Sequence, residues 1–182
     1  MSSQYAVAAF CDPLSLWGAS VNGIESRIAS AGKRVGEVDE STNYQLTQLS
    51  NATGGSTNDS NGLRQAGSRS RNLASESMLK LTDVERESEE ARNKVAAGQG
   101  NLRDQYERNL ASEGGPKLTD TEKAELAAHH SDLQEKYASQ SAQLDRIEEG
   151  RKNASAKATI LADGSQQAVA TGVASASPKS AK

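Results

Sequence analysis

The stretch WGASVNGIESRIASAGKRVGEV, from Trp17 to Val38, decides the fold of this chain. Its apolar residues follow one another at steps of four and three, which is the 3.5-residue repeat of helices that pack along a coiled-coil seam. We use the word seam for the line of side chains at these positions. The same spacing continues through polar Thr42 and Gln45 to Leu49, so we expect the tightest packing between Trp17 and Val38.

Residues at both ends of this first helix are typical of helix starts and stops. Asp12 can cap free N–H groups, and Pro13 suits the first helical position. Glycines and small polar residues over 51–62 predict a flexible linker. We therefore expect an apolar head and a first long helix over residues 1–50, followed by this linker.

Two further helical regions are expected, over 63–113 and 117–162. Leu63, Ala66, Ser70, Leu73 and Ser77 keep the spacing in the first of them but offer little to bury. Further along it, small residues would let another helix approach closely, although Gly98 and Gly100 each cost about 1 kcal/mol of helix propensity relative to alanine. The residues that we expect to form the seams are Val21, Ile24, Ile28, Val35, Val38, Leu126, Leu133, Tyr137, Leu144 and Ile147.

The motif KLTD occurs twice, at 80–83 and at 117–120. Thr82 with Glu85, and Thr119 with Glu122, have the spacing of a capping box, in which each side chain accepts a backbone N–H of the other residue. The duplication favours two helix starts over an internal repeat. After the third helix, the Ala-, Ser- and Gly-rich tail over 163–182 should be disordered alone in water, or ordered where neighbouring copies in an assembly cover it.

The composition points to thin packing. Leu, Ile, Val and Phe make up about 15% of the 182 residues, below the roughly 20% under which a globular core is hard to build. The net charge of −3 and the three prolines, however, are not those of a simply disordered chain. We therefore predict an all-α protein of elongated helices with coiled-coil-like seams, which self-associates as a homo-oligomer.

No recognisable chemistry is encoded in the sequence. His129 and His130 are adjacent, so on a helix they point about 100° apart and cannot grip one metal together. Cys11 has no companion that would make it a nucleophile, and neither a phosphate-binding loop nor a dinucleotide fingerprint is present. We expect no enzymatic activity, no bound metal and no cofactor.

Three arginines form the one basic cluster that we considered as a nucleic-acid contact, namely Arg64, Arg69 and Arg71. They lack interleaved aromatic residues, so a solvated linker is the better interpretation and no specific nucleic-acid sequence is expected as a partner. The chain has no apolar run long enough to span a bilayer and no secretory signal, so we expect a protein made in the cytoplasm.

The apolar head consists of Phe10, Leu14, Leu16 and Trp17, and it holds the only Phe and the only Trp of a chain with 3% aromatic residues. Two interpretations are open. The head folds back onto its own seam, or it is a docking or membrane-contact element that buries its aromatic rings in a partner or at a membrane interface.

Three segments resemble the smallest internal core, or ejection, proteins of short-tailed bacteriophages. They are SESML at Ser75 to Leu79, NLRDQYERNL at Asn101 to Leu110, and DPLSLWGAS at Asp12 to Ser20, although the DPL segment lies near the other end of the chain in those proteins. The resemblance rests on these three short segments.

The resemblance implies a non-enzymatic virion structural protein. Such a protein sits inside the capsid in several copies near the portal, with other core or portal proteins as partners. It then passes into the host and helps to form a conduit for genome delivery across the host envelope, with host membrane contact after ejection. Two alternatives remain: a needle, tip or translocator component of a bacterial secretion system, and a cytoplasmic coiled-coil adaptor.

Overall fold

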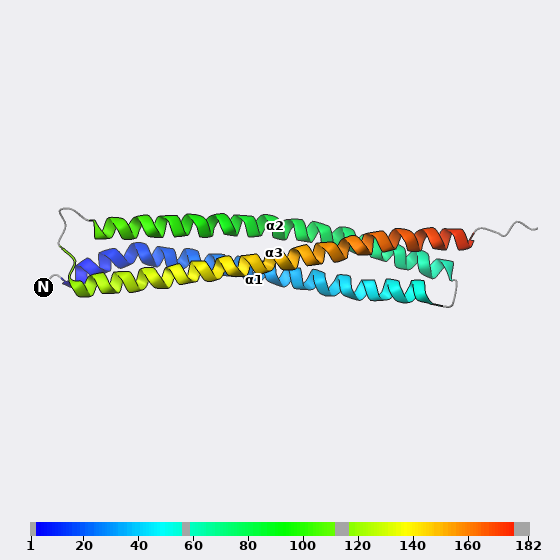
Figure 1. Ribbon diagram of the computed structural model, residues 1–182, viewed down its shortest axis with the longest axis horizontal. Helices are drawn as coiled ribbons and strands as arrows, with labels where there is room; N and C mark the ends of the chain where they lie inside the picture. Colours follow the sequence, from blue (N-terminus) through cyan, green and yellow to red (C-terminus); the bar gives the residue numbers. More distant parts are fainter. Residues whose placement is uncertain (1–2, 56–58, 112–116, 177–182) are drawn as a thin grey trace, which may run out of the picture. The chain divides into compact units, whose positions relative to one another are not determined.

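The part of the chain that the structure describes forms three long helices packed against one another (Figure 1). They are α1 (Ser3–Gly54), α2 (Ser60–Leu110) and α3 (Asp120–Ala176). This computed structural model describes residues 3–55, 59–111 and 117–176, and for residues 3–20 and 175–176 it describes the backbone alone. Within these ranges 96% of the residues are helical and there are no strands, as the sequence predicts.

The chain divides into two compact units, each built from a segment of all three helices. The first comprises Met1–Ser30 and Glu87–Arg146, and the second comprises Ala31–Arg86 and Ile147–Lys182. In the second unit α1 and α3 run parallel, because contacts between them advance together from Val35 with Gly150 to Leu49 with Gly164. α2 runs antiparallel to both.

The seams on α1 and α3 are buried at most of the positions that the spacing identifies. Val21, Ile24, Ile28, Val35, Val38, Leu133, Tyr137, Leu144 and Ile147 are all less than 10% exposed, whereas Leu126 is only half-buried. On α2 the prediction was wrong at two positions. Ala66 and Leu73 are half-buried, and Gly67 and Ala74 beside them take the core positions, because small residues there let α3 approach closely.

The core of the first unit contains large and polar side chains. Tyr137 is fully buried and lies against Gly98 of α2, so this glycine makes the close approach that the sequence suggests. Gln140 is also buried, and its Nε2 donates a hydrogen bond to the Val21 carbonyl at 2.8 Å. Gln140 Oε1 and Tyr137 Oη find no hydrogen-bond partner among the described residues. Burial raises the pKa of the Tyr137 hydroxyl.

The core of the second unit is built mainly from small side chains. Leu49 and Leu161 pack with Ala74 and Ala168 in one buried cluster. Further buried positions are occupied by small residues, among them Thr42, Ser70, Ser77, Ala154, Ala158 and Ser165. Since the stabilising free energy of burial is proportional to the apolar area buried, layers of this seam that hold such small side chains contribute little of it.

Arg151 of the second unit stands at a seam position and is half-buried. It donates two hydrogen bonds of 2.8 Å to Glu148, and it forms an ion pair with Glu85 of α2 at 3.2 Å. The hydrogen bond from Arg151 is the main cause that lowers the pKa of Glu148. The two carboxylates therefore satisfy a charge that the seam would otherwise leave without a partner.

Helix boundaries differ from the predicted ones at the start of α1 and around the linker. α1 begins at Ser3 rather than at Asp12, so Pro13 lies within it; the alanine-rich residues before this proline favour helix strongly enough to extend it. α1 continues to Gly54, and α2 already begins at Ser60. Asp59 caps α2, because its Oδ1 accepts a hydrogen bond from the Asn61 N–H at 3.1 Å.

Of the two predicted capping boxes, the second is confirmed and the first is wrong. The Thr119 N–H donates to Glu122 at 2.7 Å, and the Glu122 N–H donates to the Thr119 hydroxyl at 3.3 Å, directly before α3. Thr82, by contrast, lies inside α2 and donates to the Met78 carbonyl at 3.0 Å. Buried Leu81 and Val84 carry the α2 seam through this motif, so the helix has no end to cap.

The capping box makes the start of α3 sensitive to acid. Hydrogen bonds from the Thr119 N–H and hydroxyl lower the pKa of Glu122 below its ordinary value of 4.5. Its contribution to stability is therefore present above pH 4.5 and is lost as the pH falls through the lowered pKa. Amide hydrogen exchange in the first turn of α3 should accelerate over this range. Glu122→Gln should keep the box and lose the pH dependence; an unchanged pH dependence in this variant would contradict the assignment.

The predicted end of the third helix at residue 162 was wrong for the part of the tail that the structure describes. α3 continues to Ala176, and Ser165 and Ala168 are buried. Contacts within the same chain explain why the helix continues through these residues: Gly67 lies against Ser165 and Val169. The small side chains therefore pack against α1 and α2, and no neighbouring copy is needed to cover them.

Candidate functional site

The predicted docking residues Phe10, Leu14, Leu16 and Trp17 lie outside the described side chains. The structure gives their backbone as part of α1 and says nothing of their contacts. Docking through the head therefore stays a prediction. The seam residues named from the sequence serve the packing of the helices.

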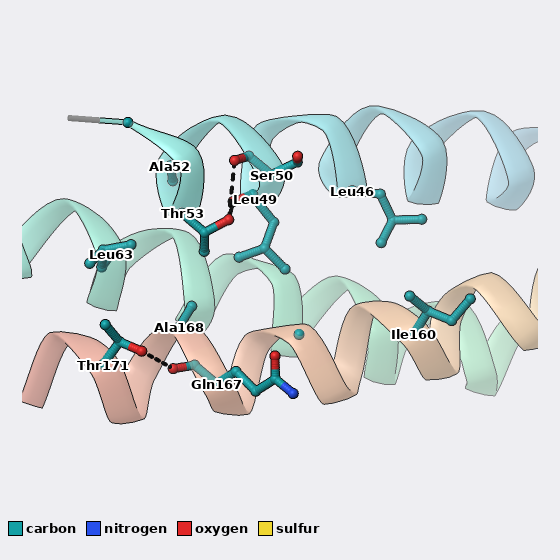
Figure 2. A pocket seen from close by; sticks show the side chains of 12 residues that line it. Leu46, Leu49, Ser50, Ala52, Thr53, Leu63, Ile160, Gln167, Ala168 and Thr171 are labelled. Carbon is teal, nitrogen blue, oxygen red and sulfur yellow. Dashed lines mark hydrogen bonds between the residues drawn. The ribbon is translucent and has the colours of Figure 1, made fainter. Parts of the chain in front are cut away.

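A groove in the second unit is the feature that sequence reasoning missed. It runs between α1 and α3 and has a volume of about 430 Å³. Figure 2 shows Leu46 and Leu49 on one helix and Ile160 on the other, with Leu63 of α2 nearby. Ile160 is 59% exposed although it is a large apolar side chain. An outward-facing isoleucine next to the seam residue Leu161 was the one local signal of this groove.

The approach of the two helices depends on Gly164 at the floor of the groove. A Cβ atom at this position would lie 2.9 Å from Leu49 Cδ2, which is closer than such atoms come in real structures. The absent side chain lets α3 lie close to α1 here.

The two threonine hydroxyls of the groove bond to their own helices. The Thr53 hydroxyl donates to the Leu49 carbonyl at 3.0 Å and to the Ser50 carbonyl at 3.1 Å. The Thr171 hydroxyl donates to the Gln167 carbonyl at 2.9 Å, and Figure 2 shows this bond and the one from Thr53 to Ser50. Because these hydroxyls bond to the preceding turn, they have less need of an occupant as a partner.

The residues that line the groove include no charged side chain. The ion pair between α1 and α3 in this unit, Lys157 with Asp39 at 2.6 Å, involves residues that do not line it. A surface of this kind disfavours a charged occupant, since a charge would lose its hydration there without gaining a partner.

His129 and His130 belong to the first unit and are both half-buried. The ring of His130 stacks on Tyr106 of α2 with centroids 4.2 Å apart, and burial lowers the pKa of His130. Among the described residues, no group of three or more His, Cys, Asp or Glu side chains is placed to hold a metal ion. The His130 ring serves the contact between two helices.

Within the described parts of the chain, none of the helices has a stretch that is both long and apolar enough to cross a membrane. Comparisons with protein-family models, with curated proteins and with solved structures give no match.

Proposed function

We propose that this chain is a non-enzymatic structural protein of a virus particle, an internal core or ejection protein. In this proposal several copies assemble near the portal, enter the host ahead of the genome and help to form a conduit across the host envelope. The segment resemblances SESML and NLRDQYERNL suggest the protein class. The observation that carries the proposal is the thin seam of small side chains in the second unit.

A thin seam suits a protein that must pass through a narrow channel. Each buried methylene group contributes about 0.8 kcal/mol, so layers built from Ala158, Ser77 and their neighbours separate at little cost. Three ion pairs between helices, Arg27 with Glu90, Arg92 with Asp145 and Lys157 with Asp39, are about one third exposed or more and add about 0–1 kcal/mol each. The helices can therefore come apart and form again without a disulfide or a large core to disrupt.

The proposal predicts where the chain is found in virus particles. Particles assembled with a tagged version of this chain should contain several copies of it, protected from protease added outside. After DNA release is triggered, the chain should leave the particle together with the genome. Quantitative mass spectrometry before and after release measures both effects, with an external capsid protein as the control that protease does cut.

Two outcomes would contradict the proposal. One is a chain that is absent from purified particles or digested on their outside. The other is its appearance in the culture medium of cells in a manner that depends on a secretion ATPase, which would support the secretion-system alternative.

A further inference from the structure

Residues 60–75 of α2, which we call the basic segment, carry positive charge only. They include Arg64, Arg69 and Arg71 and no aspartate or glutamate. In residues 76–110 of the same helix, acidic and basic residues are mixed and the acidic ones predominate. The linker that the sequence favours for the three arginines was wrong, because all three lie within α2. Charge is therefore segregated along one continuous helix.

The positive charges of the basic segment are not paired with carboxylates. Among the described residues, its three guanidinium groups form no ion pair and no hydrogen bond. Residues 41–54 of α1, at the same end of the second unit, carry no charge. Two carboxylates belong to this end, Asp59, which caps α2, and the exposed Asp163 of α3. A ligand with negative charges would supply the partners that the arginines lack.

Arg64 is held in place before any ligand binds. It is half-buried, and its Cγ lies 3.1 Å from the point that a Cβ atom of Gly172 would occupy, so its stem lies over α3. Its Nε is buried and finds no hydrogen-bond partner among the described residues. Arg71, one heptad further, lies on the same side of the helix, about 10.5 Å along its axis. A guanidinium group held in this way loses less side-chain entropy on binding.

The other exposed side chains of the basic segment are typical of contacts to phosphate. They are Asn61, Gln65, Ser68, Asn72 and Ser75. In protein–DNA complexes, phosphate oxygens accept hydrogen bonds from arginine, serine, asparagine and glutamine side chains. The segment exposes no large apolar side chain, which a helix at a membrane surface needs. It contains no aromatic residue on which the bases of a single strand could stack.

We propose that the basic segment binds the phosphate backbone of duplex DNA without regard to sequence. This inference goes beyond the proposed function and does not rest on it. Binding of this kind releases counterions, so the logarithm of the association constant falls with the logarithm of the salt concentration, with a slope of about −0.9 per phosphate neutralised. Three arginines predict a slope of about −2.7, or binding about 40-fold weaker at about 200 mM salt than at about 50 mM.

Fluorescence anisotropy of a labelled DNA duplex, titrated with the full-length protein, measures this binding. A second duplex of unrelated sequence should bind equally well. The test variant replaces the three arginines together: Arg64→Gln, Arg69→Gln and Arg71→Gln. It should bind at least about tenfold more weakly at about 50 mM salt and lose most of the salt dependence.

A matched control removes the same charge from the rest of α2. It replaces three exposed basic residues: Lys80→Gln, Lys94→Gln and Arg108→Gln. Because the net charge of the protein changes equally in both variants, only a local role of the basic segment separates them. The control should keep the affinity and the salt dependence of the unaltered protein. Circular dichroism should show the same helix content in both variants.

Equal losses in the two variants would overturn the inference, and so would a salt dependence that the test variant leaves unchanged. Failure of the unaltered protein to bind either duplex at about 50 mM salt would also overturn it. Vesicles of phosphatidylcholine with phosphatidylserine test the other polyanionic surface. Binding to these vesicles through the three arginines, without binding to DNA, would assign the basic segment to a membrane instead.

Discussion

Replacing Gly98 with alanine should lower the free energy of unfolding by about 1–3 kcal/mol, although alanine is the better helix former. A Cβ atom at this position would lie 2.5 Å from the Tyr137 hydroxyl oxygen and 2.6 Å from Cζ of the same ring. Tyr137 is fully buried, so its ring cannot move aside without disturbing the seam of the first unit. Urea unfolding followed by circular dichroism measures the change.

Gly100 provides the control for this variant, only two residues away on the same helix. It is exposed, and a Cβ atom there would have nothing within 4 Å. Gly100→Ala should therefore stabilise the protein by up to about 1 kcal/mol, through helix propensity alone. Equal stabilisation by both alanines would show that Tyr137 does not pack against Gly98 in the way described.

The variant Leu161→Ala should have the largest effect on stability, a loss of about 2–5 kcal/mol. Leu161 is fully buried. Its cluster contains only one other buried leucine, Leu49, beside Ala74 and Ala168. Truncation leaves a cavity among side chains that are too short to fill it. Thermal and urea unfolding report the loss, and amide exchange should rise most in the second unit.

Val173→Ala is the matched control on α3, because half of the Val173 side chain is exposed. It should change the free energy of unfolding by no more than about 0.5 kcal/mol. Similar effects of the two truncations would mean that Leu161 is not a core residue and that the α3 seam is placed wrongly.

The α1 seam could be predicted from the sequence because helical spacing is a local property. Val21, Ile24 and Ile28 are three and four residues apart, close to one helical turn each, and their burial follows from that spacing once a partner helix is present. On α2 the spacing predicts Ala66 and Leu73 as seam positions, one residue before the buried Gly67 and Ala74. A glycine gives no apolar signal in the sequence, although the close approach of α3 at Gly67 leaves no room for a side chain.

The groove could not be predicted, because its two walls are far apart in the sequence. Leu46 and Ile160 meet through the packing of α1 on α3, and no local pattern records that meeting. The motif KLTD illustrates the same limit on a smaller scale. Identical residues begin a helix at Thr119 and lie inside one at Thr82, since only the latter is flanked by continuous buried positions.

The small side chains along the seam of the second unit also bear on how stability varies with temperature. The heat capacity of a protein rises on unfolding chiefly because apolar surface meets water. Ala74, Ser77 and Ala158 expose little such surface when they unfold, so the rise per residue falls below the ordinary value of about 12–15 cal/mol/K. We therefore expect a shallow stability curve, with a similar and modest free energy of unfolding at low and at high temperature.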